Sequence, residues 1–166
     1  NNNNSLHRIK SIKFVKTSKA TNNMNFKLIN NAKQKTYAII MDSGDEVTEQ
    51  LMAFAKKEKV SASQFTAIGA FSETVTGFFD FSTKDYLKTT FKEQMEVLAL
   101  TGDISRYKDE YKIHAHVVLG RKDGTAHGGH LMKGIAHPTL EIILNESPGY
   151  LKREIERNSG IPLIKI

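Results

Sequence analysis

The residues with the clearest capacity for chemistry are histidines. Five of the six histidines fall between residues 114 and 137: His114, His116, His127, His130 and His137. His114 and His116 lie two apart in the apolar, strand-like run Lys112–Leu119. Side chains two apart on a strand point to the same face of a sheet. The pair therefore has the geometry for two imidazoles to share one metal ion.

A third histidine follows on the next expected strand. The dipeptide Asp123-Gly124 predicts a hairpin turn, because it accepts the positive φ that such turns require. The chain then returns antiparallel through Gly128-Gly129-His130, which places His130 beside the pair. Three histidines with a fourth position left open are typical of a catalytic or exchangeable zinc site, or of a site for another divalent transition metal. The alternative is an ordinary surface or core pair of histidines.

Glu141 is the other candidate for a functional role. It interrupts the otherwise apolar run Thr139–Leu144, so it is either a hydrogen-bonding partner or base for the histidines, or an exposed residue on the polar face of its strand. His127 is expected to be solvated beside the turn, and His137 to cap a turn before Pro138. The chain has no cysteine, which excludes disulfides, thiolate zinc sites, iron–sulfur clusters and a cysteine nucleophile.

The net charge of +6 is unevenly distributed along the chain. Residues 1–23 hold five basic residues and no acidic ones, whereas residues 24–166 hold 19 basic and 18 acidic residues. We therefore expect 1–23 to be a basic Asn/Lys-rich extension, tag or targeting segment, and 24–166 to be a single domain. A nearly neutral domain weakens the case for DNA binding, because neutralisation of phosphates supplies most of that affinity. No apolar stretch reaches the length of a membrane span, so we expect a cytoplasmic protein without membrane contact.

The positioning elements are mostly short strands. The sequence predicts strands over residues 36–42, 64–71, 74–81, 88–92, 95–101, 112–119, 128–134 and 139–145. Ser43 and Glu46 fit a capping box for one principal helix that runs to about Lys59. Residues 151–158 predict a short terminal helix, and the tail 161–166 a strand on a sheet edge. Together these elements predict an α+β domain, mostly antiparallel, with one helix packed on the sheet.

Four motifs in this order resemble the PPC (or PCC) domain family, the domain conserved between plants and prokaryotes. They are Glu96–Ile104 (EVLALTGDI), Ile113–Gly120 (IHAHVVLG), Gly128–Leu131 (GGHL) and Thr139–Ile142 (TLEI). The resemblance covers about residues 24–150. It implies an α/β sandwich-like domain that assembles as a homotrimer with sheets meeting at the subunit interfaces. For the bacterial single-domain branch, it implies a metal site, usually zinc, on the residues that match His114, His116 and His130.

The resemblance and the residues leave three functions open. The first is a metal-binding homotrimeric module with a regulatory or ligand-sensing role. The second is a zinc-dependent enzyme of hydrolase or lyase type, in which the three histidines hold the ion and Glu141 is the base. The third is DNA association, as family members are often described, although the Arg-Gly-Arg-Pro core of the plant AT-hook segments does not occur in this chain.

Overall fold

Long antiparallel strands dominate the fold. The computed structural model describes residues 25–31, 34–147 and 151–165, so the expected extension 1–23 lies outside the described residues. The elements of these ranges, in chain order, are β1 (Asn25–Asn31), β2 (Lys35–Asp42), α1 (Val47–Glu58), β3 (Ser63–Asp80), β4 (Asp85–Phe91), β5 (Met95–Tyr107), β6 (Glu110–Gly120), β7 (Ala126–Glu146), β8 (Lys152–Ile155) and β9 (Pro162–Lys165). The prediction of a mostly antiparallel α+β domain with one principal helix is confirmed for these residues.

Two strands are much longer than the sequence predicts. The predicted tight turn between residues 71 and 74 is wrong, because β3 continues through it. Bulges replace the turn: the register of β3 against β7 shifts between Gly69 and Phe71 and again between Phe71 and Glu73. Likewise, β7 joins the two predicted strands 128–134 and 139–145. A bulge adds a residue and bends a strand without ending its pairing, so a local pattern of turn residues does not distinguish it from a reversal.

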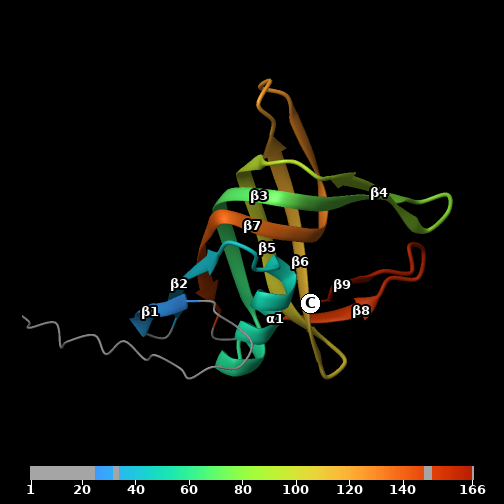
Figure 1. Cartoon of the computed structure of the whole chain (residues 1–166). Helices are drawn as coiled ribbons and strands as arrows, with labels where there is room; N and C mark the ends of the chain where they lie inside the picture. Colours follow the sequence, from blue (N-terminus) through green and yellow to red (C-terminus); the bar gives the residue numbers. More distant parts are fainter. Residues whose placement is uncertain (1–24, 32–33, 148–150, 166) are drawn as a thin grey trace, which may run out of the picture.

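Four strands close into a ring around the apolar core. β3 pairs with β5 and β7, β5 pairs with β6, and β6 pairs with β7. In Figure 1, β3 and β7 bend across β5 and β6, with α1 below them. The buried side chains of α1 complete this core, and the ring of Phe54 packs edge-on against Tyr37 of β2 with 5.0 Å between centroids. Residues that face outward on β3, β5 and β6, such as Thr66, Thr101 and His116, are left on the surface of the ring.

The helix begins later than its predicted cap. Glu46, not Ser43, is the N-cap, and its Oε2 accepts a hydrogen bond from the amide of Glu49 at 2.8 Å. The other carboxylate oxygen of Glu46 accepts from the amide of Gly134 on β7 at 3.1 Å, which ties the helix start to the ring. Ser43 lies before this point, with its hydroxyl 2.7 Å from Nδ1 of His137. The capping-box prediction therefore identified Glu46 correctly as a capping residue, but placed it three residues after the N-cap instead of at the N-cap.

The predicted terminal helix is wrong. Residues 152–155 form β8, which pairs in parallel with the end of β5 and antiparallel with β9, so the expected edge strand in the tail is confirmed. The reason is tertiary: the free edge of β5 supplies hydrogen-bonding partners that a helix would leave unused. The β8–β9 hairpin and β4 project from the same side of the molecule (Figure 1). None of the described helical residues form a segment long and apolar enough to cross a membrane.

Candidate metal centre

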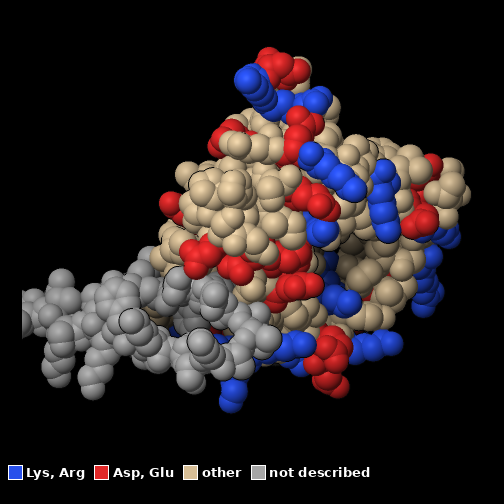
Figure 2. Space-filling model, viewed as in Figure 1, with Lys and Arg blue, Asp and Glu red and all other residues tan. Residues whose placement is uncertain are grey.

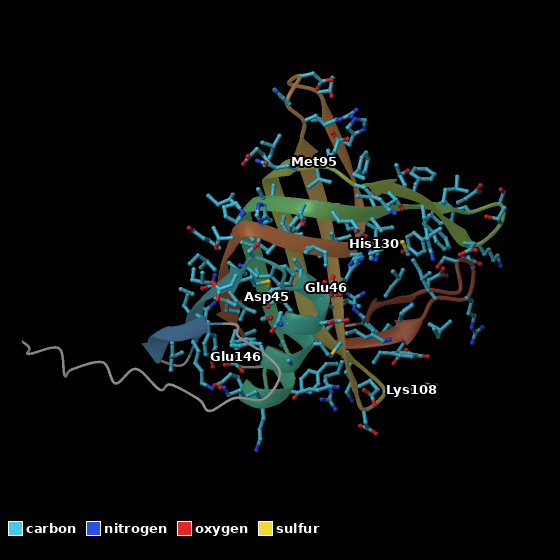
Figure 3. The ribbon with its side chains drawn as sticks, viewed as in Figure 1. Asp45, Glu46, Met95, Lys108, His130 and Glu146 are labelled. Carbon is cyan, nitrogen blue, oxygen red and sulfur yellow. The ribbon has the colours of Figure 1, made fainter. Side chains whose placement is uncertain are left out.

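Strand register brings the three predicted histidines together. His116 on β6 lies directly opposite His130 on β7, and His114 lies two residues further along β6 on the same face. On its other side, β7 pairs with β3, and there His130 lies opposite Gly77. Figure 3 shows His130 near the point where β4 and the β8–β9 hairpin leave the ring. The hairpin turn at Asp123-Gly124, which the sequence predicts, is what allows β7 to return beside β6 in this register.

The imidazole rings converge on one point. The Nε2 atoms of His114 and His116 lie 3.2 Å apart, and each of the three rings has a nitrogen within 4.8 Å of the others. The ring of His114 stacks on that of His130 with 5.1 Å between centroids, whereas His116 meets His130 edge-on at 5.5 Å. His116 is exposed and the other two are half-buried. The cluster therefore opens to the surface on one side.

The donor set fits a divalent transition metal. Two nitrogens bound to one tetrahedral zinc at the usual bond length are about 3.3 Å apart, which matches the Nε2–Nε2 separation of His114 and His116. The same separation also fits a hydrogen bond if one of the two nitrogens carries a proton. Nδ1 of His130 is buried and has no hydrogen-bond partner among the described residues. An unpartnered buried nitrogen on the third ring of the cluster favours the metal interpretation.

Burial and the neighbouring rings favour the neutral form of two of these histidines. Burial, followed by the neighbouring rings of His114 and His116, lowers the pKa of His130 to about 4. Partial desolvation of the ring and the adjacent His114 also lower the pKa of His116. A metal binds only the neutral imidazole. At neutral pH, His130 therefore offers a ligand without first having to lose a proton.

One wall of the site is aromatic. The ring of Tyr86 on β4 lies over His130 with 5.0 Å between centroids. This approach depends on Gly77: a Cβ at this position would lie 2.8 Å from the Tyr86 ring and 3.0 Å from the sulfur of Met132. The strand therefore needs a glycine where β3 passes under the site. The surface is hollowed between β4 and the β8–β9 hairpin, with Lys and Arg side chains at the edge (Figure 2).

A polar network that the sequence did not reveal adjoins His114. Asp103 on β5 lies opposite His114, with its Oδ2 3.7 Å from Nδ1 of that ring. Arg153 of β8 binds both oxygens of this carboxylate at 2.8 Å. Burial alone would raise the pKa of Asp103, but His114, Arg153 and Ser105 outweigh it and hold that pKa below its usual value. The sequence could have indicated Asp103, because it lies two residues after Thr101 and shares a strand face with it. It could not have indicated Arg153, because this residue fell in the predicted terminal helix.

The other predicted residues lie elsewhere. Glu141 is an exposed residue of β7 opposite Ile68, nine positions along β3 from Gly77, and it is not a member of the histidine cluster. The structure therefore does not bring Glu141 to the histidines. His127 is exposed and its ring packs against Phe91 at 5.2 Å between centroids. His137 lies within β7 rather than beside a turn, so its predicted turn-capping role is wrong, and its Nδ1 instead lies 2.7 Å from the hydroxyl of Ser43 before the helix.

Several solved structures share this fold. A putative DNA binding protein from Bacteroides thetaiotaomicron is 30% identical, with 87% of this chain and 98% of that chain covered and a TM-score of 0.81. A plant- and prokaryote-conserved (PPC) protein from Pyrococcus horikoshii is 29% identical, with 86% and 95% covered and a TM-score of 0.75. A metal-containing protein from Archaeoglobus fulgidus is 26% identical, with 88% and 100% covered and a TM-score of 0.73. No curated protein matches the chain.

The family assignment rests on sequence as well as fold. The family model of the Plants and Prokaryotes Conserved (PCC) domain matches residues 29–148, which include the three histidines and Asp103. Arg153 and the β8–β9 hairpin lie outside this match. The ring of β3, β5, β6 and β7 that positions the histidines lies within it. The chain therefore belongs to the Plants and Prokaryotes Conserved domain family.

Proposed function

We propose that this protein is a metal-binding homotrimeric module with a regulatory or ligand-sensing role, and that His114, His116 and His130 hold a zinc ion or another divalent transition metal. The observation that carries the proposal is the convergence of the three rings, with 3.2 Å between two Nε2 atoms and a buried, unpartnered Nδ1 on the third. A relative of the same fold is described as metal-containing, which agrees with it.

Three protein ligands leave the remaining coordination position of zinc open to an exchangeable ligand. When bound, the ion would supply a Lewis-acid centre. The protein's own contribution is to hold the rings in place and to enclose one side of the site with Tyr86. The outer side stays exposed at His116. A small molecule with an anionic or neutral donor atom can therefore reach the histidines from the surface, as a sensing role requires.

The outer face of the ring supports assembly. Thr66, Thr101 and His116 lie opposite one another on β3, β5 and β6, so they share one face. Ile68 and Val118 are two residues from Thr66 and His116 on that face and remain 61% and 43% exposed. Exposed apolar side chains gathered on one sheet face mark an interaction surface. A homotrimer covers this surface with copies of itself in closed symmetry and repeats the histidine site three times.

A zinc-dependent hydrolase or lyase is the alternative. It needs a general base beside the ion, and Glu141 lies too far along β7 for this role. Asp103 is closer, but both of its oxygens are bound by Arg153. A carboxylate held in this way, with a lowered pKa, is a poor acceptor for a substrate proton. The lack of a free base among the described groups at the site favours the non-catalytic module.

DNA association is supported by a different surface. A cavity of about 350 Å³ at the β5–β6 turn is lined by the cationic side chains Lys59, Arg106, Lys108 and Lys152, with Asp109 as the acidic member. Arg106 is held there by the carbonyl of Asp109 at 2.6 Å and by stacking over the Tyr111 ring. If this surface binds nucleic acid, affinity for duplex DNA falls steeply with salt and falls again in Lys108→Glu. Affinity that is unchanged in Lys108→Glu would exclude this surface.

The metal proposal is tested by the metal content and mass of the full chain. We expect about one zinc per chain by mass spectrometry on a particle with the mass of a trimer by light scattering. His116→Ala should lose the metal and remain folded, because a core of this size does not depend on an ion. His127→Ala is the matched control, since it removes an exposed histidine of β7 outside the cluster. Full metal content in His116→Ala would refute the site.

A further inference from the structure

Arg153 is a buried charge at the junction between the β8–β9 hairpin and the ring. Its side chain is only 5% exposed. Nε donates to the hydroxyl of Ser105 at 2.7 Å, Nη1 to the carbonyl of Pro162 at 2.9 Å, and Nη2 to both oxygens of Asp103 at 2.8 Å. A buried guanidinium is costly unless its donors are satisfied in this way. The contacts fix Arg153, and through it the carboxylate of Asp103, in one orientation.

The carboxylate lies between Arg153 and a candidate metal ligand. Oδ2 of Asp103 accepts from Arg153 and at the same time lies 3.7 Å from Nδ1 of His114, just beyond hydrogen-bond length. Asp103 and His114 are directly opposite each other on β5 and β6, so the backbone places the two side chains next to each other, and Arg153 sets the orientation of the carboxylate. The side chain of Asp103 is 19% exposed, and little water competes for its oxygens. The chain Arg153–Asp103–His114 therefore runs from the hairpin to the histidine cluster.

The two nitrogens of His114 face different partners. Nε2 lies 3.2 Å from Nε2 of His116, toward the cluster, whereas Nδ1 faces the carboxylate. An imidazole binds a metal through the nitrogen that carries no proton, so Nε2 is available only in the tautomer protonated at Nδ1. A carboxylate facing Nδ1 favours this tautomer and also fixes the plane of the ring.

We propose that Arg153 is a positioning residue of the metal centre: it holds Asp103 against Nδ1 of His114, so that the Nε2 lone pair of His114 is presented to the ion. This inference rests on the proposed metal function. It assigns a role in the site to the β8–β9 hairpin, which lies outside residues 29–148 that match the family. The competing interpretation is that Arg153 only anchors the hairpin to β5.

The test uses the full chain in four forms. They are the wild type, Arg153→Met, Asp103→Asn, and Ser105→Ala, which removes one anchor of Arg153 but leaves both of its bonds to Asp103. Two properties are measured. Long-range ¹⁵N–¹H correlation spectra of the metal-free proteins give the tautomer of His114, and competition with a chelator gives the zinc affinity.

We expect Arg153→Met and Asp103→Asn to lose the Nδ1–H tautomer of His114 and to bind zinc about 10- to 100-fold more weakly, as is typical when the partner of a ligating histidine is removed. Ser105→Ala should retain the tautomer and bind zinc within about threefold of the wild type, because it removes one neutral hydrogen bond to Arg153 and leaves the two that fix Asp103. Where Arg153→Met does not fold, Asp103→Asn decides, because it is isosteric and keeps the arginine.

Two failures are distinguishable. If the wild type binds zinc and Asp103→Asn retains both the tautomer and the affinity, the positioning role is refuted and the metal site stands. If Arg153→Met weakens zinc binding no more than Ser105→Ala does, Arg153 only anchors the β8–β9 hairpin to β5, and the inference is again refuted. If the wild type itself takes up no zinc, the proposed function falls and this inference falls with it.

Discussion

At the scale of single residues, the protonation of His130 links the candidate site to stability. Its ring is half-buried, and its Nδ1 has no hydrogen-bond partner among the described residues. Burial, with the rings of His114 and His116, lowers its pKa from 6.5 to about 4. The unfolded chain therefore binds a proton at this position over a pH range in which the folded chain does not.

The first prediction concerns the pH dependence of the metal-free protein. Because the folded pKa of His130 is lowered, its contribution is fully present above pH 6.5 and is lost as the pH falls toward 4. We expect the free energy of unfolding of the wild type to fall over this window by on the order of 2 kcal/mol more than that of His130→Gln. Urea titrations of chelator-treated protein at pH 7, 5.5 and 4.5 measure the difference. Parallel curves for the two proteins would contradict the buried, neutral state of His130.

At the scale of elements, the bends in β3 decide where the site lies. Gly69 sits at one of the register shifts with φ of 149°, where β3 passes close to β7. A Cβ at this position would clash with the carbonyl oxygen of Thr139 and lie 2.9 Å from Cα of Leu140. Both contacts are with backbone, which cannot move aside as a side chain can. The bend at Gly69 allows one strand to pair along its whole length and still curve around the core.

The second prediction compares two glycines with positive φ. Gly69→Ala should destabilise the fold by more than about 2 kcal/mol, because strain adds to a clash with the backbone of β7. Gly124→Ala is the matched control: φ is 83° in the hairpin turn and no atom lies within 4 Å of the new Cβ. It should lose only about 1 kcal/mol. Chemical denaturation measures both changes. Equal losses of unfolding free energy in the two variants would show that β3 and β7 do not pack closely at Gly69.

At the scale of the whole molecule, the ring of strands has an inner face that forms the core and an outer face that carries exposed side chains. The inner face buries side chains such as Phe65, Leu100 and Val117. The outer face carries His116 together with the exposed Ile68 and Val118. This combination places the histidine site on the same face as the proposed subunit contacts. Assembly would then bury apolar surface beside the metal centre.

The third prediction follows from that shared face. Ile68→Lys should convert the proposed trimer to monomers, because a charge in the centre of an apolar interface is costly to desolvate. The folded monomer tolerates the change, since the new cation lies opposite Glu141 on β7. Asn158→Lys is the control and adds the same charge at an exposed turn of the β8–β9 hairpin. Light scattering distinguishes the outcomes, and an intact trimer in Ile68→Lys would place the interface elsewhere.

The sequence by itself determined the features that depend on neighbouring residues. Side chains two apart on a strand share a face, so the spacing of His114 and His116 was sufficient to pair them. The Asp123-Gly124 turn was sufficient to return His130 beside them. Four short motifs were sufficient for the family, which the match over residues 29–148 confirms. The metal itself, the trimer and a cytoplasmic location stay predictions.

Only the tertiary structure decided the features that depend on distant residues. The predicted break within β3 was wrong because pairing with β7 continues through the bulges. The predicted terminal helix was wrong because Lys152 and Arg153 pair with the edge of β5, and residues 152–155 pair with β9. The same pairing brought Arg153 to Asp103, fifty residues earlier in the chain. Local patterns report on helix and strand periodicity, whereas register and edge pairing arise from contacts between segments that the sequence does not place side by side.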